Sequence, residues 1–219
     1  MTARKPKSAW SGWTKFIGLL IAGGLTGFLA ASLGMSALEE GGALASLQGA
    51  ELALMTAFLY LLMGAMVGFG TLAPRAGAAI LNVEDADEIR EDGASLGSSA
   101  LGSIIMAAIL VLLALGSPEV GVLSPASAGY TALLLAIVAT GASWRSWKGA
   151  DELMRDVMRD AGAISFYILF VGLGLWAAAA HLGFAPGPRP LDIVALLFAV
   201  PLLAAFWSVG RRGMMRPRG

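Results

Sequence analysis

The sequence predicts an all-α integral membrane protein, a bundle of six transmembrane helices with both termini in the cytoplasm. Three observations lead to this fold class. The chain of 219 residues is 57% hydrophobic and only 14% charged, whereas soluble domains carry about 25% charged residues. Its apolar residues are gathered into six long segments. Every lysine and arginine except Arg189 falls on one side of these segments, which the positive-inside rule assigns to the cytoplasm.

Each of the six apolar segments is close to the length of a transmembrane helix. A helix needs about 20 apolar residues to cross a hydrocarbon core of about 30 Å. The fourth segment is the shortest and requires a thin or locally compressed bilayer. The six form one membrane domain, residues 16–210, between a basic N-terminus (1–15) and a basic tail (211–219). The predicted spans are 16–34, 52–72, 97–116, 126–142, 161–181 and 191–210.

The first span has an alternative interpretation, because a basic start followed by an apolar segment also occurs in signal peptides. The apolar region of a signal peptide runs for about 7–15 residues and ends at a cleavage site with small residues. Residues 16–34 are longer, and Met35-Ser36-Ala37 is only a fair cleavage match. We therefore expect a retained helix. Cleavage would leave five spans and a periplasmic N-terminus.

Two polar stretches precede the third and fifth spans and resemble each other. Ala86-Asp87-Glu88-Ile89 and Ala150-Asp151-Glu152-Leu153 match at three of four positions, 64 residues apart. Acidic residues favour a helix start, because carboxylates suit the positive end of the helix dipole. We therefore expect two cytoplasmic helical extensions, each continuing into its span, unless Gly93 and Gly97 break the first one. The units 52–116 and 126–181 would then form a parallel internal repeat.

The extensions also contain candidate charge contacts. Residues 84–92 hold six acids and one base, whereas the tail after Gly210 holds four arginines and no acid. Exposed ion pairs contribute only about 0–1 kcal/mol each, so these contacts would set the register between units more than the stability. The simpler interpretation is a solvated surface. The candidates are Glu84, Asp87, Glu88 and Glu91, facing Arg155, Arg159 or the arginine tail.

Small residues and tryptophans mark further candidate contacts. Small faces allow helix backbones to approach closely in a membrane, although ordinary packing inside the bundle is the simpler interpretation of them. Amphipathic tryptophan rings settle at the headgroup level, which predicts anchoring at the inner interface. The candidate packing residues are Gly23, Gly27, Gly64, Gly68, Ser99, Ser103, Ala161 and Ser165. The candidate interface anchors are Trp10, Trp13, Trp144 and Trp147.

The sequence contains no recognisable catalytic or metal-binding pattern. It has no cysteine and a single histidine, His181, and no His/Asp/Glu set has metal-ligand spacing. The spans carry no charged residue between their ends, which argues against a proton-coupled pump or a voltage sensor. Pro201 should kink the sixth span and free a carbonyl near Leu197. We expect no enzyme activity, no cofactor and no nucleic-acid partner.

Two classes of function remain. The first is an accessory or assembly subunit of a membrane complex, or a homo-oligomer, that acts through helix packing and its cytoplasmic helices. The second is a small transporter or channel for an uncharged or small solute, built on the repeated two-helix unit. A water path lined by Ser99, Ser103, Thr140 and Ser165 would favour the second. The expected partners are membrane lipids and other membrane subunits or a second copy, in a bacterial inner membrane.

Overall fold

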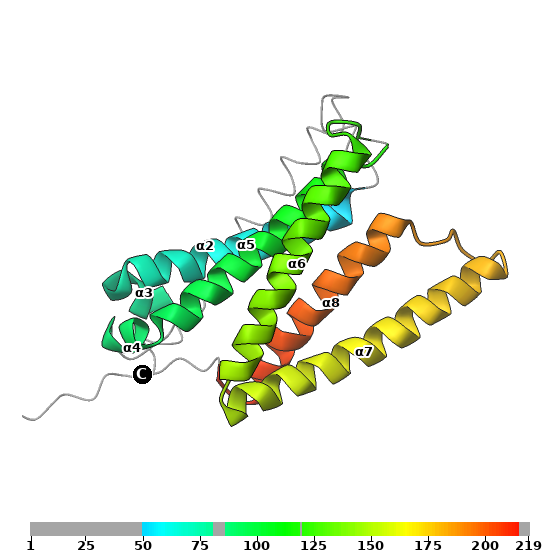
Figure 1. Ribbon diagram of the computed structural model, residues 1–219. Coiled ribbons are helices and arrows are strands. Elements are labelled where there is room, and N and C mark those ends of the chain that lie inside the picture. The colour runs from blue at the N-terminus through cyan, green and yellow to red at the C-terminus, as the bar shows by residue number, and fades with distance from the viewer. Residues whose placement is uncertain (1–49, 81–85, 119, 215–219) are drawn as a thin grey trace, which may run out of the picture.

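The computed structural model describes residues 50–80, 86–118 and 120–214, and these residues form helices joined by short turns, with no strand among them (Figure 1). Five helices are long and two are short. In chain order they are α2 (Glu51–Leu72), α3 (Pro74–Ile80), α4 (Ala86–Glu91), α5 (Gly93–Leu115), α6 (Pro125–Gly149), α7 (Glu152–His181) and α8 (Pro190–Arg211).

The five long helices correspond to the second through sixth predicted spans. By length and composition, each is long and apolar enough to cross a membrane. The fourth predicted span lies within a longer helix, since α6 has 25 residues and continues to Gly149. Its apolar part, Pro125–Trp144, is still the shortest of the five, at 20 residues. The first predicted span, together with Gly23, Gly27, Trp10 and Trp13, lies outside the described residues.

The starts of α6 and α7 are stabilised by N-capping side chains. Ser124 accepts a hydrogen bond from the Ser127 backbone N–H at 3.1 Å, and Pro125 occupies the first helical turn; both are favoured at helix starts. Asp151 accepts from the Met154 N–H at 2.7 Å and caps α7 in the same way. Because only Ala150 and Asp151 separate the helices, the chain reverses sharply there.

The two polar extensions have different structures. The prediction of one unbroken helix ending near Leu115 is wrong, because the helix is interrupted at Asp92 and α5 begins at Gly93. The alternative prediction, a break near Gly93, is confirmed. Glycine has low helix propensity, and Ile89 of α4 is buried, which turns α4 against the bundle. In contrast, α7 is one helix of 30 residues, about 45 Å long at 1.5 Å per residue.

The core is formed mainly by α2, α5 and α8. Alanines dominate it: Ala53 and Ala57 of α2 and Ala195 of α8 surround Leu110 of α5, which is fully buried. Helix α5 also packs against α6 through a second cluster that contains Ile105. Small side chains in these positions let the helix backbones approach closely.

Helix α7 lies at the edge of the bundle and packs against α8 (Figure 1). In contrast, α6 packs against α5, and α2 packs along α5. The two units predicted to repeat therefore differ in packing. The first unit pairs its own two spans, whereas the spans of the second unit, α6 and α7, lie mainly against helices outside that unit.

Candidate functional site

The closest helix contact among the predicted packing residues joins α2 and α5. A Cβ atom added at Gly64 would lie 2.9 Å from Ile104 Cγ1, 3.0 Å from the Ala100 carbonyl oxygen and 3.2 Å from Ser103 Cβ. At Gly68 it would lie 3.7 Å from Ala100 Cβ, an ordinary contact. The structure thus brings Gly64 and Ser103 together, and of Gly64 and Gly68 only Gly64 lies too close to α5 for a side chain.

The four hydroxyls that would line a water path in the transporter alternative lie on three helices, α5, α6 and α7, and two of them are buried. Ser103 is buried in the contact with α2 and donates to the Ser99 carbonyl at 2.9 Å. Ser165 is buried on α7 and donates to the Ala161 carbonyl at 2.6 Å. Thr140 and Ser99 are exposed. Hydroxyls commonly satisfy themselves in this way on their own helix.

A tyrosine from α2 meets the proline region of α8. Pro201 lies inside α8 and has no N–H to donate. The Tyr60 hydroxyl donates to the Phe198 carbonyl at 2.9 Å, and the two rings pack edge to face. The sequence predicts a free carbonyl near Leu197. The carbonyl that accepts a hydrogen bond from another helix belongs to the next residue, Phe198.

Among the side chains that the structure describes, no ion pair joins the acidic extension to Arg155 or Arg159. Asp87 pairs with Arg90 of its own helix, and α4 packs against α2, α3 and α5. Arg159 lies 3.9 Å from Asp156, one turn away on α7, and Arg155 donates to the Lys148 carbonyl at 3.2 Å.

Of the other acidic candidates, only one has a described side chain. Glu91 is exposed. Glu84 and the side chain of Glu88 lie outside the described part of the chain.

An arginine of the tail instead meets an acid of α7. Arg212 Nη2 lies 2.6 Å from Asp160 Oδ2 and joins the end of α8 to α7. Near this pair, α7 buries Val157, Ala161 and Ser165, and α8 buries Ala204 and Ser208. Small residues therefore hold the two helices in contact at this end.

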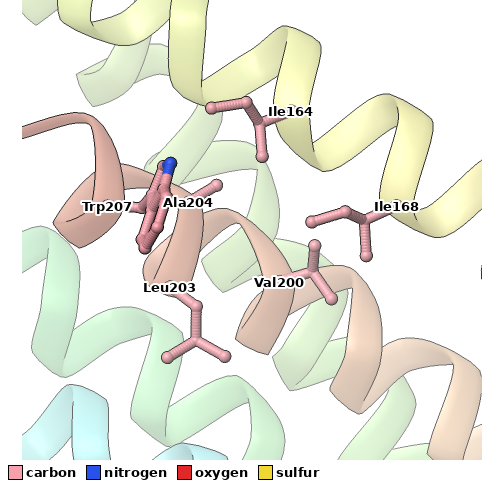
Figure 2. Close-up of a pocket in the computed structure, with 6 residues that line it drawn as sticks. All are labelled: Ile164, Ile168, Val200, Leu203, Ala204 and Trp207. Carbon is pink, nitrogen blue, oxygen red and sulfur yellow. The ribbon is translucent and has the colours of Figure 1, made fainter. Parts of the chain in front are cut away.

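A groove runs beside this contact, between α7 and α8. Figure 2 shows the two isoleucines of α7 extending toward α8, where the Trp207 indole stands at one end. The volume of the groove is about 310 Å³. It is lined by Ile164, Ile168, Val200, Leu203, Ala204 and Trp207. A second, wider hollow adjoins it and is lined by Leu203, Phe206, Trp207, Gly210 and Arg211.

The opposite side of α7, its outer face, consists of Phe166, Phe170, Gly174 and Ala177. These residues recur at helical spacing, so they share one face, and all four are exposed. The two phenylalanine rings stack with centroids 5.7 Å apart, and a Cβ added at Gly174 would meet nothing within 4 Å. Only 6% of the apolar window of α7 is buried, against 39% for α5.

The described tryptophans lie near the helix ends and at the groove. Trp144 and Trp147 are exposed in the last turns of α6, and the Lys148 ammonium lies 5.6 Å from the Trp144 ring centroid. Sequence reasoning missed Trp176, whose indole N–H donates to the Pro186 carbonyl at 2.8 Å. It also missed Trp207. Residues 200, 204, 207 and 211 are separated by three or four positions, so they share one face of the helix.

A polar cluster at the other end of the bundle was also missed. Asp192 is buried in the first turn of α8 and accepts from Arg189 Nε at 3.0 Å. Arg189 also lies 4.0 Å from Glu51 at the start of α2. The signal was available, because Arg189 and Asp192 stand three residues apart at a helix start. His181, by contrast, is exposed in the last turn of α7.

Within residues 50–80, 86–118 and 120–214, no group of three or more histidine, aspartate or glutamate side chains could hold a metal ion. A comparison with protein-family models, with curated proteins and with solved structures finds no match. The fold itself defines the class. Five long apolar helices, three of which form an alanine-rich core, are compatible with a membrane helix bundle and suggest a membrane-embedded protein.

Proposed function

We propose that the chain is a multi-pass inner-membrane protein without catalytic chemistry, which acts as an accessory or assembly subunit of a membrane complex or as a homo-oligomer. The outer face of α7 carries this proposal. Helix α7 has one main packing partner, α8, and its opposite face is exposed along Phe166, Phe170, Gly174 and Ala177. A face of this composition suits contact with another membrane helix.

The physical reason lies in how helices associate in lipid. Lipid tails are as apolar as leucine, so close backbone approach and van der Waals packing drive helix association. The open position at Gly174 permits close approach, and the stacked phenylalanines offer large contact surfaces. The proposal also places both termini and the polar start of α7 in the cytoplasm, because Arg189 is the only basic residue assigned to the outer side.

The transporter alternative has less support. Ser99, Ser103, Thr140 and Ser165 line neither of the two hollows beside α8, and three of these hydroxyls hydrogen-bond to their own helices. The two hollows beside α8 are lined almost entirely by apolar side chains. A path for a polar solute would require polar groups that line one route, and the described residues do not provide it.

The test is recovery of the tagged full-length protein from its native membranes in a mild detergent, followed by native mass spectrometry. We expect a partner or a second copy at fixed stoichiometry. Gly174→Leu should release it, because a leucine side chain blocks close approach on the outer face. Gly129→Leu is the matched control, since Gly129 is exposed on α6 and also has nothing within 4 Å of its added Cβ.

Two results would contradict the proposal. The first is recovery of the wild-type protein only as a monomer. The second is that Gly174→Leu and Gly129→Leu retain the same assembly. A homo-oligomer that depends on Gly174 supports the proposal as well as a foreign subunit does.

A further inference from the structure

We propose that the groove between α7 and α8 binds one anionic phospholipid, with an acyl chain between the helices and the phosphate at Arg211. This inference goes beyond the docking role of the outer face, and it rests only on the location of the protein in a membrane. The two surfaces lie on opposite sides of α7, so a partner and the lipid would not compete.

The acyl chain is matched by the lining of the groove. Ile164, Ile168, Val200 and Leu203 provide aliphatic surface, and no charged residue lines this part. Its volume of about 310 Å³ is comparable to small-molecule pockets, which range over roughly 300–1,000 Å³. Figure 2 shows the side chains that line the groove, with Trp207 at one end.

The length of the groove is matched to one leaflet. Val200 lies near the middle of α8, and Arg211 is its last residue. From Val200 to Arg211 the helix makes eleven residue steps and rises about 16 Å at 1.5 Å per residue, close to half of a hydrocarbon core of about 30 Å. A groove of this length runs from the bilayer middle to one interface, as a phospholipid chain does.

The phosphate is matched by an arginine at the end of the groove. Arg211 lines the wider hollow beside Trp207 and is exposed. Within the described residues Arg211 forms no ion pair within 4.0 Å, whereas its neighbour Arg212 is held by Asp160 at 2.6 Å. Guanidinium groups bind phosphate through paired hydrogen bonds, and basic residues next to a span are attracted to anionic leaflets.

A phospholipid fits these observations better than a further transmembrane helix. A helix seated in the groove would cover Arg211 and would have to provide an acid for it at the edge of the membrane, where charged residues are costly without a partner. A phospholipid supplies an apolar chain and an anion already separated by the required distance. The Trp207 indole stands between the two and contacts both hollows.

The experiment measures fluorescence quenching of Trp207 by lipids with brominated acyl chains. The full-length chain keeps Trp207, while the other tryptophans are replaced by phenylalanine, and it is reconstituted in bilayers. Brominated phosphatidylglycerol is compared with brominated phosphatidylcholine at equal mole fractions. We expect about fivefold tighter binding of phosphatidylglycerol, the factor that one cation provides near an anionic lipid surface, and loss of this preference in Arg211→Gln.

Two control variants separate a specific site from general surface charge. Arg90→Gln removes an arginine from α4 at a distance from the groove, and Arg216→Gln with Arg218→Gln removes charge from the tail. Both should retain the preference. Equal quenching by the two lipids in the parent protein, a preference that survives Arg211→Gln, or its loss in either control variant would overturn the proposal. Quenching without headgroup preference would still leave the protein in the membrane and its docking role intact.

Discussion

Replacing Gly64 with alanine tests the close contact between α2 and α5. The new methyl would lie 2.9 Å from Ile104 Cγ1 and 3.0 Å from the Ala100 carbonyl oxygen, well inside the 3.5–4.0 Å at which carbon atoms pack favourably. Ile104 can rotate, but the carbonyl belongs to the α5 backbone. We therefore expect Gly64→Ala to push α2 and α5 apart.

The expected cost combines two opposing effects. Overpacking a closely packed contact costs about 1–3 kcal/mol, whereas alanine gains about 1 kcal/mol of helix propensity over glycine. Gly64→Ala should therefore lower the free energy of unfolding by about 0–2 kcal/mol. Gly68→Ala makes the same propensity gain, but its methyl meets Ala100 Cβ at 3.7 Å. The difference between the two variants, about 1–3 kcal/mol, isolates the steric effect.

Unfolding by sodium dodecyl sulfate in mixed micelles, followed by circular dichroism, measures both variants under one set of conditions. Gly64→Ala in an Ile104→Ala background should show a smaller loss, because the nearest atom is removed while the carbonyl remains. Equal stability of Gly64→Ala and Gly68→Ala would refute this account of the α2–α5 contact. So would a full, additive loss in the double variant.

Three further predictions concern other contacts. Tyr60→Phe removes the hydroxyl donated to α8 at 2.9 Å and should lower the free energy of unfolding by about 0.5–1.5 kcal/mol; an unchanged value in the same titration would contradict it. A double-mutant cycle of Asp160→Asn and Arg212→Gln should give a coupling of at most about 1 kcal/mol, reduced by salt, because the pair is partly exposed. A coupling above about 3 kcal/mol, the range of buried pairs, would contradict this exposure. In the cysteine-free chain, Gly187→Cys should react with an impermeant maleimide on intact cells and Glu91→Cys only after permeabilisation; the reverse pattern would overturn the proposed topology.

The five long helices were predictable because their signals are local. A span is recognised from the length and polarity of one continuous segment, and the starts of α6 and α7 follow from Ser124-Pro125 and Asp151, which act within one turn. The break at Asp92 was available only as an alternative. Whether a helix continues through Asp92-Gly93 depends on where Ile89 finds a buried position, and other helices provide that position.

Small residues show where local signals end. The chain has 29 glycines, and Gly64, Gly68 and Gly174 all occur in small-residue patterns on apolar helices. Their surroundings differ: Gly64 touches a neighbouring backbone, Gly68 makes an ordinary contact, and Gly174 faces open space. A pattern along one helix identifies a face, but the contact also depends on the partner helix.

The sequence by itself determined the apolar helices and the clustering of basic residues on one side, because composition and spacing within a segment decide them. Only the tertiary structure decided that α7 packs against α8, that Arg212 meets Asp160 rather than the acidic α4, and that Trp207 and Arg211 border one groove. These contacts join residues up to 52 positions apart. The geometry of these contacts depends on which helices pack against each other through their small residues. The sequence of one helix does not determine its partner.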